Sequence, residues 1–249
     1  MRFARQVGIA AVVATVIATP ARAQAPAAQA PAAQLPTVQQ VFDHFATAVG
    51  GREAWAKVQG RSDKGTANIT FAGLTGAYER HTGAPNKMRM IIDLGMAKLD
   101  QGFDGTVGWA VQPMGAATRM PPDQEKSLAE TVQVGAEFLD ASRFVKASVD
   151  ARESFDGVDC YKLSITAKSG EVRTEYFEVT TGLRRGVITK SPMGDQKATL
   201  HDYKAFEGKL IPTTVTQSTP QGDVVLTTTA VVFTLPDPAL FKAPEGISK

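Results

Sequence analysis

The sequence predicts a mainly β protein: an antiparallel, half-open (unclosed) β-barrel of about eleven or twelve strands, with an N-terminal helix and an inserted amphipathic lid helix. From Gly65 onward, apolar and polar residues alternate with the two-residue period of a strand. Turn signals such as Asp104-Gly105 and Asp156-Gly157 separate the alternating runs at hairpin positions. Because the connections are short, consecutive strands should pair, and that many twisted neighbours must curl into a half-barrel.

Two short helices are expected before the first strand. Thr37 and Gln40 have the spacing of a capping box, and apolar residues recur at helical spacing until Gly50-Gly51 ends the helix. A second short helix at residues 52–58 carries Trp55, which we expect to fill the core because large aromatic side chains dominate core burial.

The strands form two runs with a helix between them. We expect strands at residues 65–71, 77–82, 87–94, 96–103 and 106–111, and then at 144–155, 158–168, 171–180, 183–191, 198–206, 209–219 and 223–235. Pro121-Pro122-Asp123 has the composition of a helix start. The apolar residues that follow it at four-residue spacing are Leu128, Val132, Ala136 and Leu139. This amphipathic helix, residues 121–139, is expected to cover the concave face as a lid.

The N-terminal residues predict export to the periplasm. Arg2 and Arg5 precede an apolar run at residues 7–17 that is too short to span a bilayer, and Ala21-Arg22-Ala23 has the pattern of a cleavage site. We therefore expect residues 1–23 to be a signal peptide. Residues 24–36, rich in Ala, Pro and Gln, are expected to form a linker, followed by one domain at residues 37–249. An uncleaved membrane anchor is the alternative.

Charge and cysteine content exclude two classes of protein. Residues 1–23 contain three arginines and no acid, so their removal lowers the basic residues from 27 to 24, against 25 acidic ones. A chain without excess positive charge lacks the basic face that nucleic-acid binding needs. The single Cys160 cannot form an intramolecular disulfide, which excludes a disulfide-stabilised fold, and its apolar strand neighbours predict a buried, unreactive thiol.

Sequence patterns for catalysis are sparse. The chain has three histidines, none with zinc-ligand spacing, and no nucleophile elbow or phosphate-binding loop. His201 and Asp202 are adjacent on a strand and therefore point to opposite faces, as do Glu175 and Glu178. We expect no enzyme activity, no metal and no cofactor. A hydrolase remains an alternative if His81, His201 and carboxylates meet in a cleft.

The strand at residues 87–94 carries the best candidate for a ligand surface. Met88, Met90 and Ile92 share one face, and methionine side chains suit adaptable apolar binding surfaces. The same stripe also fits an ordinary core face, and a one-residue slip would exchange it with Arg89 and Ile91. The residues expected to line the cavity or lid, with Arg89 as a polar contact at the mouth, are Met88, Arg89, Met90, Ile92, Trp109, Leu128, Val132 and Phe138.

The succession of features resembles the bacterial lipoprotein localisation carriers of the LolA/LolB-like superfamily. The matching residues are the strand from Gly76 to Pro85 and Arg89, the Asp104-Gly105 turn followed by Trp109 and Pro113, the helix after Pro121, and the closing residues 241–246. The resemblance covers residues 37–249. It implies an unclosed barrel with a helical lid over a hydrophobic cavity that takes up acyl chains, with no cofactor. In the carriers an arginine precedes the proline of the second strand and helps to hold the lid. Ala84 stands there in this chain, so Arg80 or Arg89 would have to substitute.

The leading functional prediction is a soluble periplasmic binding or carrier protein. It would hold a lipid acyl chain or another hydrophobic ligand in the concave face, and would serve lipid or lipoprotein transport to the outer membrane. A membrane donor or acceptor protein is an expected partner. The alternative is a non-catalytic envelope interaction module whose cavity is filled by its own aromatic side chains.

Overall fold

The computed structural model describes residues 34–111, 115–132, 134, 137–190 and 194–247. One compact unit comprises Leu35–Lys249. The predicted signal peptide and most of the predicted linker lie outside the described residues. Among the helices in the described ranges, none is both long enough and apolar enough to cross a membrane.

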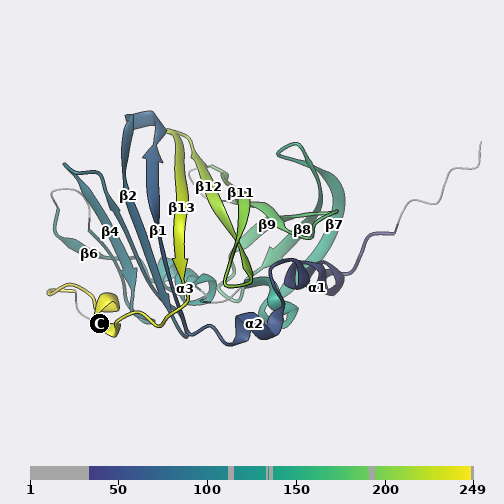
Figure 1. The fold of residues 1–249 in the computed structure, drawn as a ribbon, viewed down its shortest axis with the longest axis horizontal. Coiled ribbons are helices and arrows are strands. Elements are labelled where there is room, and N and C mark those ends of the chain that lie inside the picture. The colour runs from purple at the N-terminus through teal and green to yellow at the C-terminus, as the bar shows by residue number, and fades with distance from the viewer. Residues whose placement is uncertain (1–33, 112–114, 133, 135–136, 191–193, 248–249) are drawn as a thin grey trace, which may run out of the picture. The chain divides into compact units, whose positions relative to one another are not determined.

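Thirteen strands form one antiparallel sheet (Figure 1). Their order in space is β6-β5-β4-β3-β2-β1-β13-β12-β11-β10-β9-β8-β7, and no pairing between described residues joins β6 to β7. The sheet is therefore an unclosed half-barrel, which confirms the predicted fold class. The strands are β1 Gly60–Ile69, β2 Leu74–Gly83, β3 Lys87–Asp93, β4 Lys98–Phe103, β5 Gly108–Val111, β6 Ala117–Arg119, β7 Lys146–Phe155, β8 Val158–Thr166, β9 Val172–Glu178, β10 Arg184–Thr189, β11 Gln196–Phe206, β12 Lys209–Thr219 and β13 Gly222–Val232. The unexpected strand is β6, whose three residues are too few to show a two-residue period.

The N-terminal helices agree with the sequence patterns. α1, Val38–Ala48, begins with a complete capping box: the Gln40 amide donates to Thr37 Oγ1 at 3.2 Å, and the Thr37 amide donates to Gln40 Oε1 at 2.8 Å. α2, Arg52–Ala56, carries Trp55, which is buried and donates its indole N–H to the Val49 carbonyl at 3.0 Å. The described residues also form four short 3₁₀ turns: η1 Thr70–Ala72, η2 Glu137–Leu139, η3 Ala141–Arg143 and η4 Pro238–Phe241.

The inserted helix is shorter than expected. α3 runs from Pro122 to Thr131, and Val132 already has extended backbone angles. The β-branched Thr131, Val132 and Val134 follow one another closely, and β-branched residues are weak helix formers. The expected lid helix at residues 121–139 is therefore wrong in its second half. Ala136 lies outside the described residues.

The main core lies between α1, η2 and the strands β7 to β9. Its centre is a set of phenylalanine rings whose centroids are 5.3 Å apart for Phe138 and Phe177, 5.4 Å for Phe42 and Phe138, and 5.5 Å for Phe45 and Phe177. Leu163 and Ile165 of β8 are fully buried against this set. The phenylalanines at the centre of this core are called the aromatic cluster below: Phe42, Phe45, Phe138, Phe144 and Phe177.

The face of the sheet on which α1 packs is called the inner face below. Val231 belongs to the core under α1 and pairs with Asp63. Asp63 pairs with Arg80, and Arg80 pairs with Met90. Paired residues share a face, so this row follows the inner face from β13 to β3. The inner face thus has a half covered by α1 and the aromatic cluster, and an open half on β1 to β5.

Candidate functional site

The open half has an apolar floor on the inner face. Ile92 and Tyr78 are buried there with Ala67, and half-buried apolar side chains surround them: Met90, Leu94, Leu99 and Leu226. Across this floor the side chains lie in rows set by strand pairing: Thr82, Met88 and Phe103; Arg80, Met90 and Gln101; Tyr78, Ile92 and Leu99. The structure therefore places Met88, Met90 and Ile92 together on the inner face, in the register that the sequence favoured.

A hollow of about 210 Å³ opens over this floor. Its walls are apolar apart from Asp100 and Gln101 of β4, and the apolar residues are Met90, Ile92, Leu99, Ala110 and Val111. Ligand cavities are mostly apolar with a few placed polar groups, and this hollow has that character.

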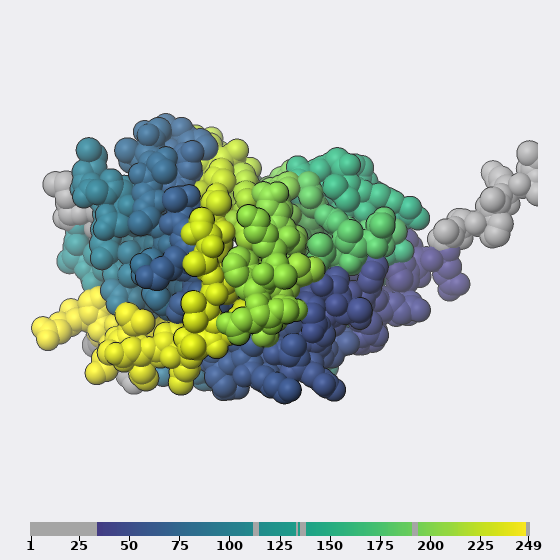
Figure 2. Space-filling view, in the orientation of Figure 1, coloured from purple at the N-terminus to yellow at the C-terminus, as the bar shows by residue number. Residues whose placement is uncertain are grey.

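Two predicted site residues lie on the outer face, away from the hollow. Arg89 pairs with Gly102, and Gly102 pairs with Trp109, so these residues share the face opposite to Met88 and Met90. Arg89 Nη2 donates a hydrogen bond to Asp100 Oδ2 at 2.7 Å, and Arg89 Nη1 donates one to the Leu240 carbonyl at 3.3 Å. Its place as a polar contact at the cavity mouth is therefore wrong: it ties the C-terminal segment to β3. In Figure 2 that yellow segment runs along the lower edge of the blue and teal strands.

Trp109 is buried for a local reason. Its indole ring lies directly over Gly102, where an added Cβ would be 2.2 Å from Trp109 Cζ2. The expectation that Trp109 lines the cavity is wrong because β5 pairs with β4 in a register that turns this side chain outward. The two-residue pattern around Trp109 identifies a strand. It does not identify the face on which the side chain lies, because β5 has only four residues.

The predicted lid residues separate into three environments. Leu128 is half-buried on α3, and Val132 is buried just after the helix ends. Phe138 lies in η2 within the aromatic cluster and is 1% exposed. Phe138 is therefore a core residue of the covered half and not part of a lid.

α3 connects the two arms of the half-barrel. On one side of the helix Glu125 accepts hydrogen bonds from the Gly108 amide and from Arg119, both at 2.9 Å, and the Ala129 carbonyl accepts from Asn86 at 3.3 Å. On another side the helix meets the β8–β9 turn: Ser127 Oγ donates to Glu171 Oε2 at 2.5 Å, and Glu130 Oε2 accepts from the Ser169 amide at 2.8 Å. Figure 1 shows α3 behind β13, between the strands of the two arms. α3 has the position of a lid, and these polar contacts hold it there.

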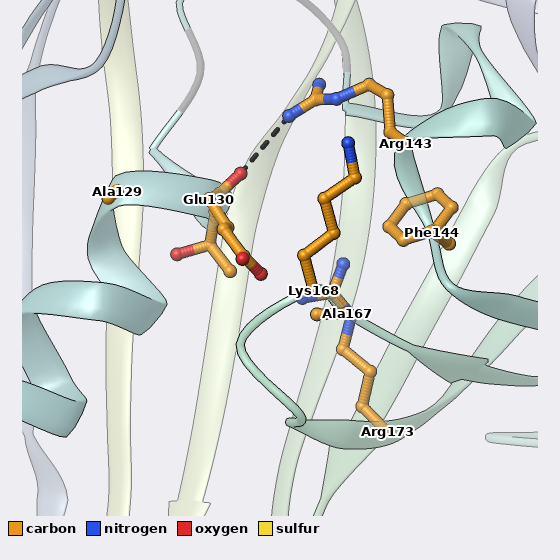
Figure 3. Close-up of a pocket in the computed structure, with 8 residues that line it drawn as sticks. Ala129, Glu130, Arg143, Phe144, Ala167, Lys168 and Arg173 are labelled. Carbon is orange, nitrogen blue, oxygen red and sulfur yellow. Dashed lines mark hydrogen bonds between the residues drawn. The ribbon is translucent and has the colours of Figure 1, made fainter.

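A second cavity of about 180 Å³ lies between α3 and the β8–β9 turn (Figure 3). Three basic side chains approach it, Arg143, Lys168 and Arg173, together with Glu130, whose carbonyl accepts from Arg143 Nη2 at 3.2 Å. Arg173 also pairs with the fully buried Glu175 at 2.9 Å. The cavity thus has three basic side chains and the Glu130 carboxylate in its walls, and the contact between Arg143 and Glu130 joins α3 to the covered half.

A charged cluster lies at the centre of the inner face, and the sequence patterns did not predict it. The side chain of Asp63 is 1% exposed and lies between two guanidinium groups, with Arg61 Nε 2.6 Å from Oδ1 and Arg80 Nη2 2.6 Å from Oδ2. Burial alone would raise the pKa of Asp63, but the charges and hydrogen bonds of Arg80 and Arg61 outweigh burial and hold that pKa below its usual value. The available signal was the i, i+2 spacing of Arg61 and Asp63, which places both on one face of a strand.

The candidates for catalysis do not assemble into one site. His81 Nδ1 lies 2.9 Å from Ser62 Oγ, and its Nε2 lies 3.5 Å from Glu79, all on β1 and β2. His201, on β11, instead faces Asp156 at 3.3 Å. Strands β1, β13 and β12 separate the two histidines, so the cluster that would indicate a hydrolase is not formed.

The remaining chemical groups are also unlike a reactive centre. Burial raises the pKa of the Cys160 thiol to about 11, which keeps the thiol protonated at neutral pH. Across the ranges that the structure describes, no group of three His, Cys, Asp or Glu side chains could hold a metal ion.

Comparison with solved structures identifies the fold. A DUF1329 family protein from Desulfovibrio piger superposes with a TM-score of 0.57 at 14% identity, over 82% of this chain and 97% of that chain. A LolA superfamily protein from Nitrosomonas europaea gives 0.55 at 14% identity, over 84% and 99%. The chain has the LolA fold. A domain assigned to outer membrane lipoprotein-sorting proteins, from Vibrio parahaemolyticus, gives 0.52 at 13% identity, over 78% and 91%. No protein-family model and no curated protein matches the sequence of this LolA-fold chain.

Proposed function

We propose that this protein carries an apolar ligand, such as a lipid acyl chain, in the open half of its inner face. The observation that carries the proposal is the apolar floor around Met90, Ile92 and Leu99, which α1 and the aromatic cluster leave uncovered beneath a hollow of about 210 Å³. The lipoprotein-sorting assignment of the Vibrio domain with the same fold supports a role in the cell envelope. The signal peptide predicted at residues 1–23 supports a periplasmic location.

The size of the hollow determines how the ligand enters. Ligand sites commonly measure about 300 to 1,000 Å³, so the hollow of about 210 Å³ is too small for a long chain. α3 is held across the inner face mainly by polar contacts through Glu125, Ser127 and Glu130. α3 lines the cavity of about 180 Å³ rather than this hollow, and release of these contacts would free more of the inner face beside β5 without disturbing the aromatic cluster. A shift of α3 would therefore make room for a long chain.

The test is uptake of a fluorescent fatty acid by the protein purified from the periplasm, with native mass spectrometry and lipid extraction to detect a ligand already bound. Met90→Trp fills the hollow and should lower uptake at least tenfold while the fold is retained. The matched control is Ile91→Trp, because Ile91 is the next residue on β3 and points to the outer face. Equal uptake by both variants would place the ligand elsewhere. The intact mass should also show loss of residues 1–23.

A second candidate is an envelope interaction module without a ligand. It is favoured by the aromatic cluster, which fills the covered half of the inner face with the protein's own side chains. A purified protein that contains no lipid and takes up no fatty acid would favour this candidate over the carrier.

A further inference from the structure

The charged cluster of Arg61, Asp63 and Arg80 carries more positive than negative charge. Two guanidinium groups share one carboxylate, so the cluster has a net charge of one positive unit at the centre of the inner face. Tyr78 also neighbours the cluster, and its hydroxyl is neutral because burial raises its pKa. Lys64 and Glu79 pair with each other on the opposite face of the same strands. The excess charge is therefore not neutralised by its neighbours.

The cluster also has unused hydrogen-bond donors. Arg61 bonds to Asp63 only through Nε, and Arg80 only through Nε and Nη2. Within the described part of the chain, both terminal nitrogens of Arg61 and Nη1 of Arg80 have no hydrogen-bond partner. The Arg80 side chain is 38% exposed, although it stands on the inner face. It can therefore be reached by a ligand that enters the half-barrel.

The apolar floor begins beside these donors. Arg80 pairs with Met90, and Met90 pairs with Gln101, so the guanidinium side chain neighbours two residues that line the hollow of about 210 Å³. Arg61 lines a second hollow, of about 100 Å³, together with Trp55, Tyr203 and Arg184, and Arg184 pairs with the buried Glu175. The inner face thus places an excess cation beside a recess with mainly apolar walls, a polarity that matches an amphiphile with an acidic head.

We propose that the ligand is an anionic amphiphile, whose singly charged oxyanion head binds Arg80 and Arg61 while its acyl chain lies over Met90, Ile92 and Leu99. This inference rests on the proposed function and adds the chemical class of the ligand. A carboxylate or a phosphodiester forms charge-assisted hydrogen bonds with free guanidinium donors, whereas a hydroxyl head leaves the excess charge unpaired. The head group should therefore decide affinity among ligands with the same chain.

The experiment measures the affinity of the full chain for oleate and for oleyl alcohol, which differ only in the head. The wild-type protein should bind oleate at least tenfold more tightly. Arg80→Gln should reduce this oleate preference about tenfold while affinity for the alcohol changes less than twofold. Because both ligands are measured on each variant, a general loss of folded protein lowers both affinities and leaves their ratio unchanged. Arg61→Gln should act in the same direction.

The matched control is Arg152→Gln, which also removes an aspartate-paired arginine but acts on β7, at the opposite end of the sheet from the hollow. It should leave the oleate preference intact.

Lysophosphatidylglycerol and lysophosphatidylcholine then distinguish the source of the anion. Preference for lysophosphatidylglycerol extends the site to phosphodiester lipids, and preference for oleate over both lysolipids assigns the site to fatty acids. Equal binding of oleate and oleyl alcohol by the wild type would overturn the head-group inference and leave the carrier function standing. Binding of neither would overturn both.

Discussion

At the scale of single residues, Asp63 shows what a sequence pattern cannot reveal. The segment Gly60-Arg-Ser-Asp-Lys64 has no apolar alternation, so the first strand was expected to start at Gly65. The structure begins β1 at Gly60 because β2 and β13 pair with it on both sides. Arg61 is a local partner of Asp63, but the second guanidinium, from Arg80, and the pairing of β1 with β2 and β13 come from remote parts of the chain and make the buried charge tolerable.

Asp63→Asn should therefore destabilise the protein in a pH-dependent way. The folded-state pKa of Asp63 lies below its usual value, so the stabilisation is present above about pH 4 and is lost as the pH falls through that lower pKa. We expect a loss of about 3 to 5 kcal/mol in the free energy of unfolding at neutral pH. Urea unfolding of both proteins at neutral and strongly acidic pH measures this difference. The exposed Asp123→Asn serves as control. A penalty of equal size at both pH values would contradict the assignment.

At the scale of elements, the helix after Pro121 was predicted at its start and not at its end. Proline and acidic residues identify a helix start locally, and α3 begins at Pro122 as expected. Its end and the place of Phe138 depend on contacts with other parts of the chain. Phe138 fits among Phe42, Phe144 and Phe177, which are remote in sequence or belong to other elements. A four-residue apolar period could not separate lid residues from core residues.

α3 should open more readily when its contact with β5 is removed. Glu125→Ala deletes the acceptor of both the Gly108 amide and Arg119, whereas Lys126→Ala changes an exposed neighbour on the same helix. The Arg119 side chain is 42% exposed, so solvent weakens its ion pair with Glu125. Removal of the pair should therefore raise the population of the open position of α3 only modestly, and we expect uptake of fluorescent fatty acid to be about two- to fivefold faster. Stopped-flow fluorescence measures the rate. If Lys126→Ala accelerates uptake equally, the effect does not come from this contact.

At the scale of the whole molecule, the half-barrel was predictable because it follows from many repeated local signals. Alternation and hairpin turns gave twelve of the thirteen strands and their meander. The faces of Met88, Met90 and Ile92 followed from the same period. Arg89 and Trp109 were misplaced because a cavity is defined by what covers a face, and coverage by α1, α3 and the C-terminal segment depends on the complete chain.

The unequal covering of the inner face leads to a prediction for the ligand-bound protein. A chain bound over Met90 and Ile92 should slow local opening of β3 and β4, residues 87–103, which line the open half, and of α3, residues 122–131, which is hydrogen-bonded to β5 beside it. β7 and β8, residues 146–166, should change little because the aromatic cluster already covers them.

Hydrogen–deuterium exchange with and without oleate measures this contrast at short labelling times, when exchange reports local opening. At long labelling times exchange reports global unfolding, and any bound ligand raises the free energy of unfolding by about 2.7 kcal/mol at a hundredfold excess over Kd. Both halves then gain protection. Early protection confined to residues 87–103 and 122–131 would support a ligand in the open half. Early protection centred on residues 146–166 would mean that the aromatic cluster parts to admit the ligand, and that the covered half is the container.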